Sequence, residues 1–126
     1  NEQSHAITDF IKMAKRDKKI KMRTNGEESR QLLYSGDAAE CILTITKNYK
    51  ELEKDKSMDI SSGHWIKIKE VAEIIADQIE GVEIIPGHKI DQTQKNAMNG
   101  PNNEALKFWK PKTSLRDGIK LMIQNI

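Results

Sequence analysis

The sequence has little of several things that would mark a specialised class of protein. It contains one cysteine, Cys41, and therefore no internal disulfide, which excludes a disulfide-stapled secreted fold. No apolar run approaches the roughly 20 residues that span a bilayer, and no basic-then-apolar leader is present. We therefore expect a cytoplasmic chain without membrane contact, in which Cys41 is a small core residue.

The charges are many but nearly balanced. The chain has 126 residues, and its 21 Lys and Arg exceed its 19 Asp and Glu by only two. This balance gives no global field that would indicate a nucleic-acid partner. Residues 15–23 are nevertheless strongly basic, and they have two interpretations: a solvated helix end and turn, or an electropositive rim that faces a phosphate. The length predicts a single domain over 1–126, smaller than a complete two-lobed enzyme.

Hydrophobic periodicity predicts helices that alternate with short strands. Apolar residues recur at helical spacing over about 5–17, 37–54 and 67–79, and again after Ser114, which begins a capping-box pattern with Asp117. Short apolar segments at 20–23, 32–34, 58–60 and 82–85 predict strands. The expected fold class is α+β, with the helices packed on short strands.

The segment from Arg30 to Asp37 places a cation directly before a predicted strand and an acceptor directly after it. Asp37 and Glu40 have the spacing of a capping box, so we expect Asp37 to be the N-cap of the next helix. A guanidinium offers five donors in a flat fork that matches phosphate oxygens. Arg30 is thus a candidate phosphate ligand, although a surface arginine in a turn is the commoner explanation of the residue alone.

Residues 86–103 have no periodicity, and a connection of this length is usually a binding loop, a lid or a disordered segment. Its polar side chains supply donors suited to ribose hydroxyls and phosphates, and a plain mobile loop fits the composition equally well. These side chains are His88, Lys89, Asp91, Asn96, Asn99, Asn102 and Asn103.

Segments over almost the whole chain resemble, in order, motifs of the extended short-chain dehydrogenase/reductases, which include the NAD(P)-dependent epimerases and dehydratases of nucleotide sugars. Arg30 to Asp37 resembles the family's Arg-Asp-Phe-x-Tyr-Val-x-Asp, and residues 59–63 resemble its Asn-x-Gly-Ser-Gly. A helix and strand follow, then a loop in the place of Arg-Pro-Gly-Asp. Residues 106–118 are similar to Leu-Gly-Trp-x-Pro-x-Thr-Ser-Leu-x-x-Gly.

The resemblance implies a substrate site. It implies that Arg30 binds the pyrophosphate of a nucleotide-diphosphate sugar. His88 takes the place of the family's loop arginine, with Lys89 beside it and Asp91 in the same loop. Met22 and Arg23 would border the base of the nucleotide.

The same family's cofactor and catalytic motifs are missing from this chain. The seven glycines form neither Gly-x-x-Gly-x-x-Gly nor Gly-x-Gly-x-x-Gly. The family's Tyr-x-x-x-Lys pair is absent, because Tyr34 is followed at that spacing by Ala38 and Tyr49 by Glu53. The histidines and Cys41 have no metal-ligand spacing. We therefore expect no catalytic residue, metal or cofactor in this chain, and NAD or NADP in the full-length enzyme.

These observations favour a C-terminal, substrate-binding lobe that lacks its N-terminal Rossmann half and is inactive alone. They are also compatible with an oligomer. The start at Asn1 rather than methionine is compatible with a truncated product. The alternative is a freestanding module that contacts nucleic acid or an acidic partner through residues 15–23. His64 could suggest an acid or base, but an isolated histidine in a turn is more often incidental.

Overall fold

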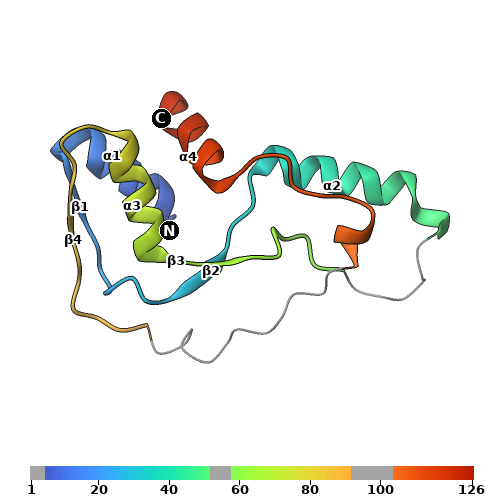
Figure 1. Cartoon of the computed structure of the whole chain (residues 1–126), viewed down its shortest axis with the longest axis horizontal. Helices are drawn as coiled ribbons and strands as arrows, with labels where there is room; N and C mark the ends of the chain where they lie inside the picture. The colour runs from blue at the N-terminus through green and yellow to red at the C-terminus, as the bar shows by residue number, and fades with distance from the viewer. Residues whose placement is uncertain (1–4, 52–57, 92–103) are drawn as a thin grey trace.

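A computed structural model describes residues 5–51, 58–91 and 104–126 of the chain. The described residues form four α-helices, four short strands and two 3₁₀ turns (Figure 1). The helices are α1 (Ala6–Asp17), α2 (Ser35–Lys47), α3 (Ile68–Gln78) and α4 (Leu115–Asn125), and the 3₁₀ turns are η1 (Tyr49–Glu51) and η3 (Ala105–Lys107). The strands are β1 (Lys19–Lys21), β2 (Ser29–Gln31), β3 (Trp65–Lys67) and β4 (Glu83–Ile85). The predicted α+β class is confirmed.

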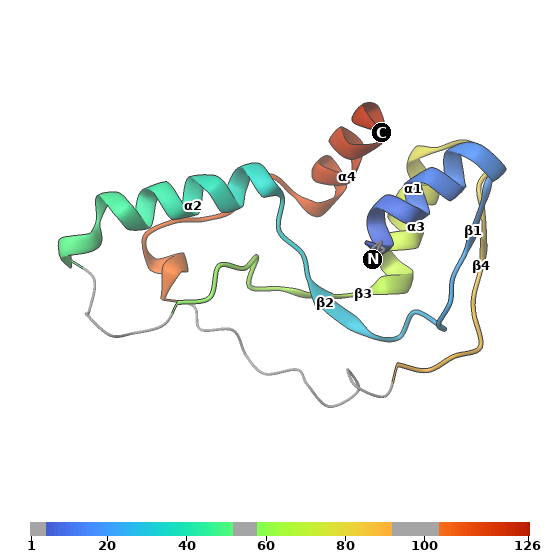
Figure 2. The same cartoon turned by 180° about the vertical axis from the view of Figure 1, so that it is seen from behind.

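The strands form two separate pairs. β1 runs parallel to β4, with Ile20 opposite Ile84, and β2 runs antiparallel to β3, with Arg30 opposite Ile66. The β1/β4 pair stands at one end of an elongated molecule, the β2/β3 pair crosses the middle, and α2 extends to the other end (Figures 1 and 2).

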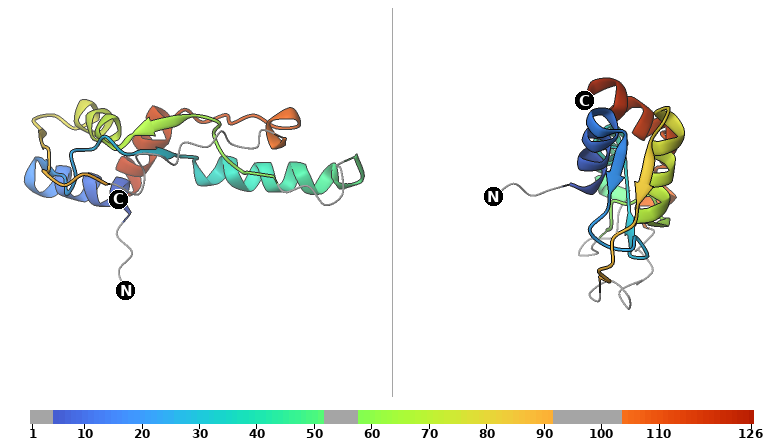
Figure 3. Two further views of the ribbon diagram at one scale, coloured as in Figure 1. Left: turned by 90° about the horizontal axis from the view of Figure 1, so that it is seen from below. Right: turned by 90° about the vertical axis from the view of Figure 1, so that its left-hand side faces the viewer.

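The main core lies where α1 and α3 pack side by side against the β1/β4 pair (Figure 3). The helices were predicted because their apolar residues fall on one stripe, and those stripes are the buried ones: Phe10, Ile11 and Ala14 on α1, and Val71, Ala72 and Ile75 on α3. A second, smaller cluster centres on Cys41, Ala105 and Trp109 under α2. Cys41 is therefore a core residue, as predicted, and burial raises the pKa of its thiol.

Two strand predictions were wrong. The strand near Arg30 covers Ser29–Gln31 and contains this arginine, whereas residues 32–34 lie outside it. Residues 58–60 form no strand, and the partner of β2 is Trp65–Lys67 instead. In both cases the pairing between segments far apart in sequence, rather than local apolar spacing, decides where the extended backbone becomes a strand.

The predictions for α2 also need correction. Its N-cap is Tyr34, not Asp37, and the helix ends at Lys47. The buried face carries Asp37 and Cys41, while Ile42, one of the apolar residues at helical spacing in the predicted helix, is 52% exposed.

Asp37 is buried because it joins α2 to the segment before α4. Its carboxylate accepts hydrogen bonds from the backbone N–H groups of Lys112 (3.1 Å) and Thr113 (2.8 Å), and from the Thr113 hydroxyl (3.3 Å). Glu40, the expected partner in the capping box, instead forms an ion pair with the Lys112 ammonium. By contrast, the predicted cap at Ser114 is confirmed, since its hydroxyl accepts the Asp117 N–H.

Candidate anion-binding site

The backbone segments that follow β1 and β4 remain hydrogen-bonded to each other beyond the ends of the two strands. The Met22 N–H donates to the Ile85 carbonyl, the Gly87 N–H to the Thr24 carbonyl, and the Asn25 N–H to the Lys89 carbonyl, each at 2.9 Å. Thr24 and Lys89 form an isolated parallel bridge. Because the two segments run side by side, Arg23 lies next to the loop that carries His88 and Lys89.

Gly87 allows this close approach. A Cβ atom at this position would lie 2.3 Å from the Arg23 carbonyl oxygen and 2.5 Å from that of Met22. Both atoms belong to the backbone and cannot rotate away, so any larger residue would push the two segments apart. The backbone atoms that Gly87 approaches are more than sixty positions away in the sequence, so local pattern does not indicate this contact.

Arg30 links β2 to the same loop. Its Nη2 lies 3.3 Å from an Asp91 carboxylate oxygen, and its Nη1 donates to the Ser29 carbonyl at 2.9 Å. The Arg30 side chain remains 38% exposed. The guanidinium is thus oriented toward the loop and retains surface that a ligand can reach.

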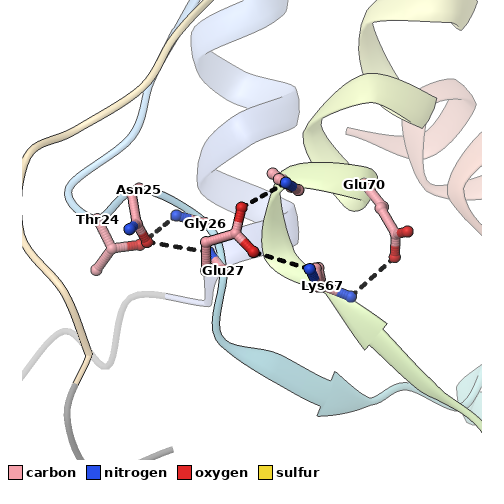
Figure 4. A network of polar contacts seen from close by, with 7 residues as sticks. Thr24, Asn25, Gly26, Glu27, Lys67 and Glu70 are labelled. Carbon is pink, nitrogen blue, oxygen red and sulfur yellow. Dashed lines mark hydrogen bonds and ion pairs between the residues drawn. The ribbon is translucent and has the colours of Figure 1, made fainter. Parts of the chain in front are cut away.

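A polar network holds the turn between β1 and β2 against the start of α3 (Figure 4). Gly26 has a positive φ of 76°, and its carbonyl accepts the Lys69 N–H at 3.0 Å. The Glu27 carboxylate lies between the ammonium groups of Lys67 and Lys69, and these partners lower the pKa of Glu27 to about 2. The network fixes the start of the strand that carries Arg30.

The structure therefore brings together part of the predicted set. Arg23, His88 and Lys89 are exposed, and Arg30 contacts Asp91. Met22 is buried in the main core and packs there, so a role beside a nucleotide base stays a prediction for this residue. The loop asparagines at 96, 99, 102 and 103 lie outside the described residues.

The larger hollow found in the described parts of the chain lies elsewhere. It is a groove of about 1090 Å³ between α1, the segment after β2, β3, α3, α4 and the segment before α4, and none of the predicted binding residues lines it. His64 borders this groove and is exposed, and Trp65 in β3 lines it as well.

Arg23, Arg30, His88 and Lys89 supply hydrogen-bond donors of the kind that bind anions. Within residues 5–51, 58–91 and 104–126, no three metal-ligating side chains cluster. The described helices also include none with the length and apolarity that crossing a membrane requires. Among the described residues, the β1/β4 pair is not joined to a glycine-rich turn that opens a helix, which is the arrangement that binds a dinucleotide in Rossmann folds.

Comparison with known proteins gives three kinds of similarity. A family model described as the NAD dependent epimerase/dehydratase family matches residues 1–61. The chain is 29% identical over 124 residues to GDP-L-fucose synthase of Sinorhizobium fredii (strain NBRC 101917 / NGR234), a match that covers 92% of this chain and 38% of that protein. It is 31% identical over 96 residues to GDP-L-fucose synthase 1 of Arabidopsis thaliana, a match that covers 75% of this chain and 28% of that protein.

Among solved structures, RMD from Pseudomonas aeruginosa complexed with NADPH has the same fold over most of this chain. The TM-score is 0.73 at 19% identity, and the match covers 95% of this chain and 40% of RMD. The chain thus spans well under half the length of the relatives it matches, and its resemblance to this group of enzymes is confirmed.

Proposed function

We propose, from the premise that this chain is related to the NAD-dependent epimerase/dehydratase family, that it is the part of such an enzyme that binds the nucleotide-diphosphate sugar. It forms the C-terminal lobe in this proposal, and an N-terminal Rossmann half supplies the cofactor site and every catalytic group. NAD or NADP would there oxidise or reduce the sugar.

One observation carries the proposal: a non-local contact, Arg30 with Asp91, places the guanidinium beside the loop that holds His88 and Lys89. The Thr24–Lys89 bridge places Arg23 next to the same loop. Arg23, Arg30 and the pair His88 and Lys89 thus come from three stretches of sequence whose backbones lie near one another in the fold. A diphosphate is the anion that such a cluster suits, because each arginine offers several donors in a fixed plane.

The relatives suggest which nucleotide to try first. Both curated relatives are GDP-L-fucose synthases, so GDP is the first ligand to test and UDP the second. The chain alone is expected to bind either weakly, because in the proposed enzyme the other half completes the site.

A titration of the isotope-labelled chain, followed by amide chemical shifts, tests the proposal. GDP and UDP are expected to shift the amides of residues 23–30 and 87–91. The Arg30→Ala variant should lose these shifts, whereas Arg16→Ala, which removes an exposed arginine of α1, should keep them.

The same titration with single-stranded and duplex oligonucleotides separates the proposal from a basic binding module. Shifts confined to residues 15–23, with an affinity that falls steeply as salt rises, would contradict the sugar-nucleotide function and favour nucleic acid.

A further inference from the structure

Glu28, the residue directly before β2, has a carboxylate of which only one oxygen is hydrogen-bonded. Its Oε1 accepts the Thr24 hydroxyl at 2.5 Å. Its Oε2 is shielded from water and has no hydrogen-bond partner among the described residues. An acceptor in this position has lost the hydrogen bonds of water without gaining others, which costs free energy in the free chain. The unpaired oxygen therefore needs a physical explanation.

The cations near Glu28 in the sequence and fold pair with other carboxylates. The preceding residue, Glu27, turns toward α3 and lies between two lysine ammonium groups at the start of that helix (Figure 4). Arg30, two residues further along, contacts Asp91. None of the ion pairs within the described parts of the chain includes Glu28. Its carboxylate is thus available to a donor from outside the chain.

The backbone holds Glu28 in place beside the candidate anion-binding site. The Glu28 carbonyl accepts the Ile68 N–H at 2.9 Å, which ties it to the start of α3. Thr24, which its side chain contacts, forms the bridge to Lys89 in the loop after β4. Arg30 contacts the same loop. Glu28 and Arg30 therefore each contact one of the two paired segments that follow β1 and β4.

The chemistry of a carboxylate limits what Glu28 can bind. An ionised carboxylate only accepts hydrogen bonds, and its charge repels a phosphate. Its ligand is therefore an uncharged donor, and the hydroxyl groups of a ribose are donors of this kind. A carboxylate that accepts from a ribose hydroxyl is also how dinucleotide-binding folds recognise the sugar of their cofactor.

The spacing between Glu28 and Arg30 suits the ribose rather than the base. Two residues of a strand span about 6–7 Å, and Glu28 lies two residues before Arg30. In a nucleoside diphosphate the ribose is joined through its C5′ atom to the first phosphate, and the base lies beyond it. A nucleotide with its phosphates at Arg30 therefore has its sugar ring, before its base, within reach of Glu28.

We propose that Glu28 accepts hydrogen bonds from the ribose hydroxyls of the nucleotide, and so makes the site selective for ribonucleotides over deoxyribonucleotides. This inference rests on the proposed function, in which Arg30 binds the phosphates. Glu28 as a whole is only half-buried, and a carboxyl group turns easily about its last bond, so Oε2 can meet a hydroxyl that enters beside Arg30. The bound hydroxyl supplies the hydrogen bond that Oε2 lacks in the free chain.

Chemical-shift titrations of the chain with GDP and with 2′,3′-dideoxy-GDP test the proposal. The unaltered chain should bind GDP roughly 10-fold more tightly, which is the loss expected from one hydrogen bond to a charged group. In Glu28→Ala the two dissociation constants should become nearly equal. Glu27→Gln is the matched control, because the neighbouring carboxylate faces the lysines of α3, and it should keep the preference for GDP.

A second variant covers the case in which Glu28→Ala disturbs the turn by losing the contact with Thr24. Glu28→Gln keeps the shape of the side chain and one acceptor, so it should fold normally and show a smaller preference for GDP than the unaltered chain. Equal binding of the two nucleotides by the unaltered chain would overturn the proposal. An undiminished preference in the Glu28 variants would overturn it as well, because another group would then recognise the ribose.

The outcomes for the two proposals are distinguishable. If both nucleotides shift the amides around Arg30 with equal affinity, only the role of Glu28 is wrong. If neither nucleotide shifts these amides, the proposed function itself fails.

Discussion

Removing the carboxylate of Asp37 should strongly destabilise the fold. The Asp37 side chain is buried, with 4% of the residue exposed, and it accepts three hydrogen bonds from residues 112 and 113. Hydrogen bonds to a charged group contribute about 1.5–3 kcal/mol each, and a donor left without a partner costs about 1–3 kcal/mol. Lys112 is exposed and its N–H can regain water, so the lower ends of these ranges apply.

We therefore expect Asp37→Ala to lower the free energy of unfolding by about 3 kcal/mol, a large part of the roughly 5–15 kcal/mol of a typical domain. Urea unfolding followed by far-UV circular dichroism measures this loss. With a denaturant slope of about 1–3 kcal/mol per molar urea, the midpoint should fall by about 1–3 M. Asp37→Asn keeps one acceptor and should lose less.

Lys112→Ala is the matched control. It removes the neighbouring Lys112–Glu40 ion pair, in which the lysine side chain is 71% exposed, and leaves the backbone N–H groups in place. An exposed pair contributes about 0–1 kcal/mol. If Asp37→Ala cost no more than Lys112→Ala, the link between α2 and α4 would not stabilise the fold as we infer.

Two further predictions concern the strand ends and the turn. Gly87→Ala should lower the free energy of unfolding in urea by more than about 1 kcal/mol and should abolish the nucleotide-induced shifts, because the added Cβ meets the Arg23 carbonyl. Gly81→Ala is the control. Nothing lies within 4 Å of a Cβ there, so this variant should lose only the modest free energy that an alanine at positive φ costs. Equal costs at the two glycines would contradict the close approach. The pKa of Glu27 is lowered from 4.5 to about 2, so its stabilising contribution is complete above pH 4.5 and disappears as the pH falls toward 2. In Glu27→Gln the urea midpoint should depend less on pH in that window. If the midpoint of the variant depended on pH as strongly as that of the unaltered chain, the stabilising role of the lysine partners would be refuted.

Local pattern predicted the helices well. The apolar stripes of α1 and α3 and the Ser114 cap are properties of a few neighbouring residues, and the structure shows them as expected. Ile42 is the exception: the apolar spacing of α2 allows two overlapping stripes, and packing against Ala105 and Trp109 selects the one that contains Cys41.

The features that local pattern did not predict depend on distant partners. Asp37 has the same local sequence whether it caps a helix or binds the backbone of residues 112 and 113, and only the fold distinguishes the two. The contact of Arg30 with Asp91 was likewise not foreseen, although the family resemblance had already placed both residues in one site. The groove joins surfaces from segments that are far apart in the sequence, and no motif marks it.

The affinity of the Arg30→Ala variant for GDP tests the central claim most directly. Loss of a charge-assisted contact to phosphate of about 1.5–3 kcal/mol predicts a dissociation constant roughly 10- to 100-fold higher than that of the unaltered chain. The measurement is a chemical-shift titration at constant salt, with Arg16→Ala as the charge-matched control. Arg30→Ala should lose this affinity while Arg16→Ala binds GDP as the unaltered chain does. If both variants bound GDP as tightly as the unaltered chain, Arg30 would not be a phosphate ligand and the proposed function would be wrong.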